Sequence, residues 1–245
     1  MDMVEAYSWA FIHKRWDELR RMPIPDKGFE ESFREYLYGK IGFNIASDIR
    51  DTGFGLSYST FSCVPHELDV ICVKDKDLFA FELKHYEVSD ITKEIVFTFL
   101  GKVTDFYFKN AEILSSYKII LLLLTINRSV DDSIRKLCIA YGIKLIEPTL
   151  MTLGTMDYFS RDLYQKIPEN DELKTETQKL IENINSLLES YDYSFSDIFR
   201  YKDNKIEIDL PSLGKIDSNE ALNKTKECYN LFDTVRKTWK SSKRN

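Results

Sequence analysis

The sequence feature that most constrains the fold is a pair of apolar runs joined by four polar residues. Residues 67–73 read Glu-Leu-Asp-Val-Ile-Cys-Val, and residues 78–84 read Leu-Phe-Ala-Phe-Glu-Leu-Lys. Two runs of this kind around a short polar connection predict a β-hairpin, and in the simplest register Val73 pairs with Leu78. Because both runs are largely apolar, we expect these strands to be central in a buried sheet.

This register brings charged side chains together. Asp69 lies opposite Glu82, and Glu67 lies opposite Lys84. Side chains alternate along a strand, so Asp69, Glu82 and Lys84 share one face, with Cβ atoms roughly 5–7 Å apart. Two opposed carboxylates repel each other, and a divalent cation such as Mg²⁺ would offset that repulsion. A neighbouring lysine could hold a water molecule or stabilise a phosphate transition state.

The remaining pattern divides the chain into three parts. Residues 1–26 predict an amphipathic helix and a linker with two prolines, residues 27–150 an α/β core, and residues 151–245 a mostly helical C-terminal appendage. Apolar periodicity and capping residues predict helices over residues 29–40, 89–110, 129–141, 171–191 and 219–240. Aliphatic runs predict strands over residues 118–125 and 143–146, a short one over 205–210, and one or two within 45–61. The expected fold is therefore α/β, with a mixed central sheet flanked by helices.

Composition excludes several classes of protein. Hydrophobic residues make up 43% of the chain, which rules out wholesale disorder. The longest apolar run, residues 119–126, is far shorter than the roughly 20 residues of a membrane helix, and no signal peptide is visible. The four cysteines are widely spaced and predict no disulfide framework or zinc site, so we expect a cytoplasmic protein. The net charge of −6 argues against a protein that coats nucleic acid, but it allows a local basic surface.

The acids and the lysine carry a resemblance. Asp69, followed by Glu82-Leu83-Lys84 on the next strand, resembles the PD-(D/E)xK, or restriction-endonuclease-like, nucleases over about residues 27–148. The resemblance implies a restriction-endonuclease-like sheet, Asp69 and Glu82 as ligands of Mg²⁺ or Mn²⁺, and Lys84 as the residue that positions or activates water. Gly28-Phe29-Glu30 is similar to a helix start in the Mrr-like and Holliday-junction-resolvase-like branches. That similarity implies Glu30 as a further metal-site acid, with Glu31 as its nearest competitor.

The sequence also departs from the family pattern. Leu68 stands where many members have proline before the first acid. Some branches carry a glutamine or a second lysine on the helix that follows the motif, and Lys102 is the nearest candidate. His66 and His85 flank the expected site, where a histidine could act as a base or contact phosphate, although a strand-end histidine is more often structural.

The implied function is a magnesium-dependent deoxyribonuclease that hydrolyses phosphodiester bonds with a metal-activated water. The alternative is a non-catalytic α/β module whose appendage binds nucleic acid or protein. Because many relatives pair two active sites, and because the first and last helices carry apolar stripes with Trp9, Trp16 and Trp239, we expect a homodimer. The basic residues 236–244 are expected to contact phosphates, or else to form a solvated tail.

Overall fold

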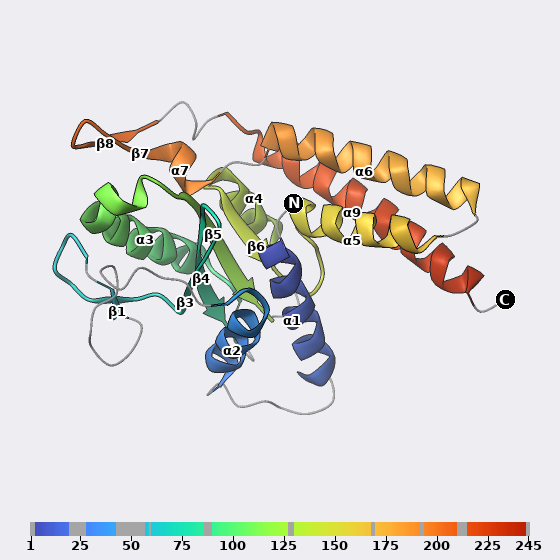
Figure 1. Cartoon of the computed structure of the whole chain (residues 1–245), viewed down its shortest axis with the longest axis horizontal. Helices are drawn as coiled ribbons and strands as arrows, with labels where there is room; N and C mark the ends of the chain where they lie inside the picture. The colour runs from blue at the N-terminus through green and yellow to red at the C-terminus, as the bar shows by residue number, and fades with distance from the viewer. Residues whose placement is uncertain are drawn as a thin grey trace.

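The structure, a computed structural model, describes residues 3–19, 28–42, 57–58, 60–85, 90–126, 130–167, 170–191, 194–209 and 215–243. Over these ranges, no helix combines the length and the apolar character that crossing a lipid bilayer requires. The architecture is α/β, with a mixed four-stranded sheet flanked by helices and a largely helical C-terminal region (Figure 1).

The central sheet has the strand order β3-β4-β5-β6. β3 (Val70–Lys74) and β4 (Asp77–Lys84) form an antiparallel hairpin, and Val73 pairs with Leu78 as predicted. β5 (Lys118–Thr125) and β6 (Ile143–Ile146) run parallel to β4, with the predicted bounds. The central position expected for both strands of the hairpin is confirmed for β4, but it is wrong for β3, which forms the edge of this sheet among the described residues.

The first run of the predicted hairpin is broken just before β3. β2 (His66–Glu67) pairs with β1 (Ser57–Tyr58) in a separate two-stranded sheet. Glu67 therefore does not lie opposite Lys84, and that prediction is wrong. The reason is local: the Asp69 carboxylate accepts a hydrogen bond of 2.6 Å from the backbone of β4, and this side-chain contact takes the place of the next ladder pair.

Helices cover both faces of the sheet, and the period-two alternation of β5 explains why. Its odd-numbered apolar residues join a buried cluster with α3 (Lys93–Leu114) and α4 (Asp132–Ala140). Its even-numbered apolar residues join a second cluster with α1 (Met3–Leu19) and α2 (Phe29–Ile41). A strand that is buried on both faces in this way needs a helical layer on each side.

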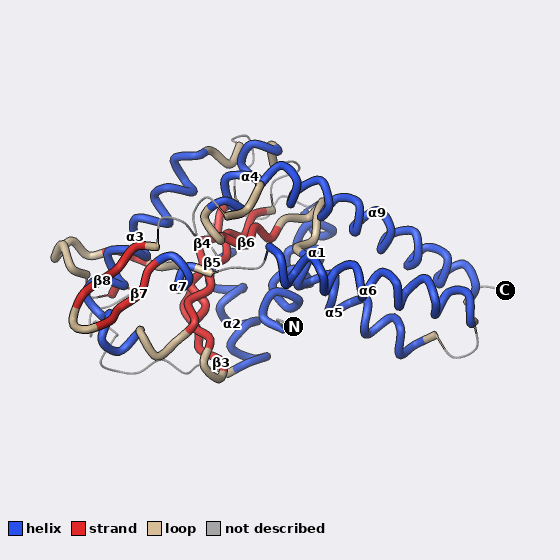
Figure 2. The backbone as a smooth tube through the Cα atoms, turned by 90° about the horizontal axis from the view of Figure 1, so that it is seen from above, coloured by secondary structure: helices blue, strands red, loops and turns tan. Residues whose placement is uncertain are grey.

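The C-terminal region reaches both ends of the molecule. α5 (Leu153–Lys166), α6 (Asp171–Tyr191) and α9 (Ser218–Ser242) pack together and extend away from the sheet, with the C-terminus at their far end (Figures 1 and 2). α7 (Phe195–Ile198) and the β7–β8 hairpin lie at the opposite end of the long axis. Buried residues after position 150 belong to both sheet clusters, among them Phe195 on the α3 side and Leu180 and Phe232 on the α1 side.

The last predicted strand has a partner strand in the structure. β8 (Lys205–Ile208) pairs with β7 (Phe199–Lys202), which we did not predict. The two residues between them, Asp203 and Asn204, have positive φ angles of 51° and 59°. A two-residue connection of this kind, with both residues left-handed, is typical of tight hairpins, so the Asp-Asn pair was the available signal.

Two predicted helices are shifted. The helix predicted over residues 89–110 runs instead from Lys93 to Leu114, with a kink at Asn110. α4 begins at Asp132, because the Asp131 side chain caps it by accepting a hydrogen bond from the backbone N–H of Ser133 at 2.7 Å. The predicted start of α4 at residue 129, and most of the strands predicted over 45–61, lie outside the described residues.

Candidate active site

Two buried acids meet at the carboxyl end of β4. Glu82 lies on β4 and is 2% exposed, and Asp69 lies directly before β3 and is 6% exposed. Glu82 belongs to the face of the sheet that α3 covers, because it follows the buried residue Ala80 by two positions and contacts Lys102 of α3. The proximity of the two acids agrees with the predicted register.

Two lysines compensate the negative charge. Lys84 Nζ lies 2.7 Å from Glu82 Oε1 and 3.9 Å from Asp69 Oδ2. Lys102 Nζ, on α3, lies 3.0 Å from each carboxylate oxygen of Glu82. Glu82 is therefore held by two ammonium groups, whereas Asp69 is held mainly by the 2.6 Å hydrogen bond from the backbone N–H of Leu83.

Asp69 has fewer positive charges beside it than Glu82 has, and its pKa is raised. Burial and the neighbouring Glu82 carboxylate raise the pKa of Asp69 to about 7, although the backbone N–H of Leu83 and the Lys84 ammonium oppose this rise. Glu30 contributes a smaller rise in the same direction. Near neutral pH the Asp69 carboxyl therefore exchanges its proton readily, whereas the ion pairs of the two lysines are made with Glu82.

The first turn of α2 places Glu30 near this pair. Phe33 of α2 is fully buried and packs edge-on against Phe81 of β4, with ring centroids 5.3 Å apart. Arg34 Nη2 donates a hydrogen bond of 3.0 Å to the backbone carbonyl of Asp69. These contacts bring the start of α2 to the acids, and Glu30, rather than Glu31, is the residue whose charge reaches Asp69.

The donor set suits a hard divalent cation only in part. Carboxylate oxygens of Asp69 and Glu82 are the ligands that Mg²⁺ prefers, and a bound cation would relieve the repulsion between two buried acids. However, within the described ranges no group of three or more His, Cys, Asp or Glu side chains is arranged to hold a metal ion. Glu30 is near the pair but does not complete such a group, so Asp69 and Glu82 are the two residues that would hold the ion.

Lys102, which the sequence offered as the nearest candidate for a second lysine, contacts Glu82 in the structure. Phe99, Val103 and Phe106 form the buried face of α3, and Lys102 lies on that same face, three residues after Phe99. A lysine on the apolar face of a helix must find an anion, and this was the signal that could have identified it. Of the flanking histidines, His66 contacts Asp105 of α3, with Nε2 and Oδ2 3.0 Å apart.

The second flanking histidine, His85, lies beside α2. Its ring centroid is 5.8 Å from that of Phe29, the residue before Glu30. This contact belongs to the packing between the end of β4 and the start of α2. The possible roles of His85 as a base or as a phosphate contact stay predictions.

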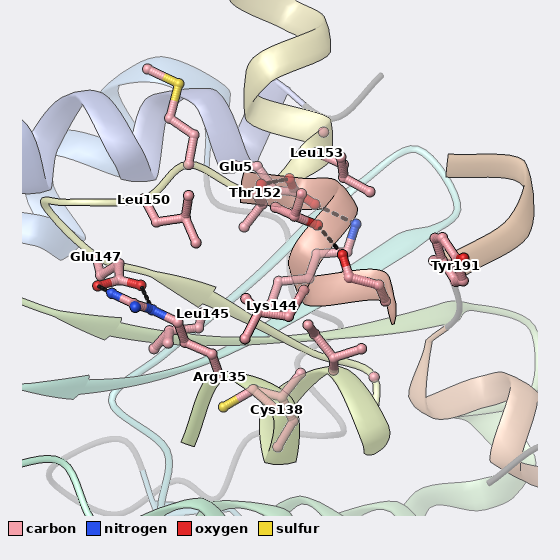
Figure 3. A pocket seen from close by; sticks show the side chains of 18 of the residues that line it. Glu5, Arg135, Cys138, Lys144, Leu145, Glu147, Leu150, Thr152, Leu153 and Tyr191 are labelled. Carbon is pink, nitrogen blue, oxygen red and sulfur yellow. Dashed lines mark hydrogen bonds and ion pairs between the residues drawn. The ribbon is translucent and has the colours of Figure 1, made fainter. Parts of the chain in front are cut away.

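A separate pocket lies where α4, β6 and α1 meet the C-terminal helices (Figure 3). Its charged lining residues are paired with each other. Lys144 forms an ion pair with Glu5, and Arg135 forms a two-pronged contact with Glu147, at 2.7 Å and 2.8 Å. The acids that line this pocket are thus each matched by a cation, whereas Asp69 lies beside a second carboxylate.

Comparisons with known proteins identify no relative. No protein family, no curated protein and no solved structure matches this chain.

Proposed function

We propose that this chain is a magnesium-dependent nuclease of the restriction-endonuclease-like type that hydrolyses phosphodiester bonds in DNA. The observation that carries the proposal is the pair of buried acids, Asp69 and Glu82, with the Lys84 ammonium within 4 Å of both. A stable protein gains nothing from two buried carboxylates at the end of a central strand, because their desolvation and repulsion cost free energy. Such an arrangement is expected where the charges serve binding or chemistry.

Each residue of the site has a proposed role that follows from its position. Asp69 and Glu82 would hold the cation, which when bound neutralises phosphate charge and lowers the pKa of a coordinated water. Lys84 reaches both acids, so its ammonium can orient the attacking water or donate to a phosphate oxygen. Lys102 holds Glu82 in place, and Glu30 adds negative charge on the α2 side.

One observation favours the alternative, a non-catalytic α/β module that binds nucleic acid or protein. Glu82 is already neutralised by Lys84 and Lys102, and no three-acid group is present among the described residues. In that case the cluster would be a structural ion-pair network. The two proposals differ in one respect that can be measured directly: only the nuclease requires a divalent ion.

The test is a cleavage assay on duplex, branched and single-stranded DNA and on RNA, each with Mg²⁺, with Mn²⁺ and with a chelator. We expect metal-dependent cutting of DNA by the wild-type protein. Lys84→Ala should slow it by about 10²–10⁴-fold, the usual contribution of a residue that handles a proton in the reaction. Lys109→Ala is the matched control, because Lys109 is an exposed lysine on α3. Equal cutting by the wild type and Lys84→Ala, or no cutting of any substrate, would exclude the proposal.

A further inference from the structure

Residues 60–65, Thr-Phe-Ser-Cys-Val-Pro, form a tight turn that holds two large apolar side chains in water. Phe61 is 68% exposed and Val64 is 53% exposed. The Thr60 hydroxyl closes the turn by donating to the backbone carbonyl of Val64 at 2.6 Å, and Cys63 has a positive φ of 61°. Apolar side chains gathered on an exposed, ordered turn are more typical of an interaction site than of a solvated loop.

A single acid on α3 fixes the turn. Oδ1 of Asp105 accepts a hydrogen bond of 2.8 Å from the backbone N–H of Ser62, and Oδ2 accepts one from the Ser62 hydroxyl. His66 Nε2 lies 3.0 Å from the same Oδ2, and the backbone N–H of Phe61 donates to the Asp105 carbonyl at 3.1 Å. These contacts pre-order the turn without covering its apolar tip.

The same helix connects the turn to the candidate active site. Lys102, which holds Glu82, precedes Asp105 by three residues, and Phe108 follows Asp105 by three. The rings of Phe108 and Phe61 meet edge to face, with centroids 6.2 Å apart. At 1.5 Å per residue, Lys102 and Phe108 are separated by about 9 Å along the helix axis, which is within the span of a few nucleotides.

We propose that the turn over residues 60–65 contacts an exposed base of the substrate, with Phe61 stacked on a base a few nucleotides from the bond that is cut. This inference rests on the proposed nuclease function. An aromatic ring stacks on any base, because every base has a π-face, and apolar side chains at a base step favour an unstacked strand. A turn that is already ordered loses little conformational freedom on binding, so most of the stacking energy would appear as affinity.

The experiment measures binding of oligonucleotides that contain 2-aminopurine, whose fluorescence reports base unstacking, with Ca²⁺ in place of Mg²⁺. The proteins are the wild type, Phe61→Ala and Phe97→Ala. Phe97 is a matched control: it is 45% exposed on α3, but its ring contacts Tyr141 instead of the turn. We expect wild type and Phe97→Ala to bind and to change the fluorescence. Phe61→Ala should bind about 5- to 150-fold more weakly, the loss of one stacked base, and lose the fluorescence change.

Parallel cleavage assays with Mg²⁺ separate this inference from the proposed function. If the wild type cuts DNA, and Phe61→Ala binds with the same affinity and fluorescence, the base contact is excluded and the nuclease remains. If Phe61-dependent binding occurs without any cutting, the nuclease is excluded and the base contact remains. If the wild type neither binds nor cuts, both are excluded.

Discussion

Asp69 and Glu147 are both buried acids, but the charged groups beside them have opposite signs. Glu147 is held by the two-pronged contact with Arg135. Asp69 faces Glu82 and has a pKa raised to about 7, well above the ordinary value of 3.8. The folded state therefore retains the Asp69 proton in a range of pH where the unfolded chain has released it. In consequence, the Asp69 carboxyl makes the protein less stable as the pH rises from about 4 to 7.

This loss of stability with rising pH gives a prediction for Asp69→Asn. The amide keeps an acceptor for the backbone N–H of Leu83 but removes the charge. At pH 8 the free energy of unfolding without metal should rise by roughly 1–4 kcal/mol, and the gain should shrink towards zero near pH 4. Chemical denaturation across this pH range measures it. Glu147→Gln is the control and should be less stable than wild type, since Arg135 loses its carboxylate partner. A destabilised Asp69→Asn at pH 8 would contradict our assignment of the charge conflict.

At the scale of elements, the contact between α1 and α5 depends on a glycine. Gly154 lies against the carboxylate of Glu5, which is fully buried and paired with Lys144. A methyl group at this position would overlap the Glu5 carboxylate. The absence of a side chain on α5 thus allows a buried ion pair between α1 and β6.

Gly154→Ala should therefore lower the free energy of unfolding by about 1–3 kcal/mol, the usual cost of forcing a group into a packed interior. Gly39→Ala is a matched control in another helix, α2, where an added Cβ has no neighbour within 4 Å. That variant should gain up to about 1 kcal/mol, because alanine favours helix more than glycine does. The measurement is urea denaturation of both variants. A neutral or stabilising Gly154→Ala would show that Glu5 is not confined as described.

The elements that the sequence predicted are those fixed by local pattern. The β3–β4 register follows from a four-residue connection, and β5 and β6 follow from uninterrupted aliphatic runs. The proximity of Asp69 to Glu82 could therefore be predicted from the sequence, although the ladder ends at the pair Val70–Phe81 and does not include them. The positions of Lys102 and Asp105 depend on how α3 is rotated against the sheet, and the break before β3 depends on a side-chain hydrogen bond. The periodicity of α3 places Lys102 on the apolar face but does not identify Glu82 as its partner, because the two residues belong to different elements.

At the scale of the whole molecule, the homodimer stays a prediction with less support than the sequence gave it. It depended on apolar stripes of the first and last helices. In the structure Trp9 is 6% exposed and belongs to the α1 cluster beneath the sheet. Trp239 packs against the cluster of Leu163 and Val235 in the helical extension. Trp9 and Trp239 thus pack within one chain, whereas Trp16 is half-buried and Leu231 of α9 is exposed. Sedimentation at micromolar concentration, with and without DNA, measures the oligomeric state.

The basic C-terminal end lies far from the candidate active site. It continues as helix through Ser242, and the end of α9 lies at the opposite end of the long axis from α3 (Figures 1 and 2). A short oligonucleotide at Asp69 cannot reach it, so its contribution should depend on substrate length. Exposed Lys240 and Lys243 are the residues to change, because Lys237 is paired with Asp233.

The double variant Lys240→Glu and Lys243→Glu should weaken binding of a long duplex. It should also reduce the steepness of log affinity against log salt concentration by about two, because each lysine accounts for about one phosphate contact. Binding of a short oligonucleotide should not change. Fluorescence anisotropy at several salt concentrations, with duplexes of two lengths, makes the comparison. If the long duplex shows an unchanged slope, the end of α9 is a solvated surface without a role in binding.

The central claim is that Asp69 and Glu82 form a metal centre. The most direct test is calorimetric titration of Mg²⁺ and Mn²⁺ into the wild-type protein and into Asp69→Asn. Glu67→Gln, which changes an exposed acid, is the control. We expect the wild type and Glu67→Gln to bind, with affinity increasing from pH 6 to pH 8 because the ion must displace the proton of Asp69. Asp69→Asn should bind neither ion. Absence of binding to the wild type, or equal binding by Asp69→Asn, would contradict the claim.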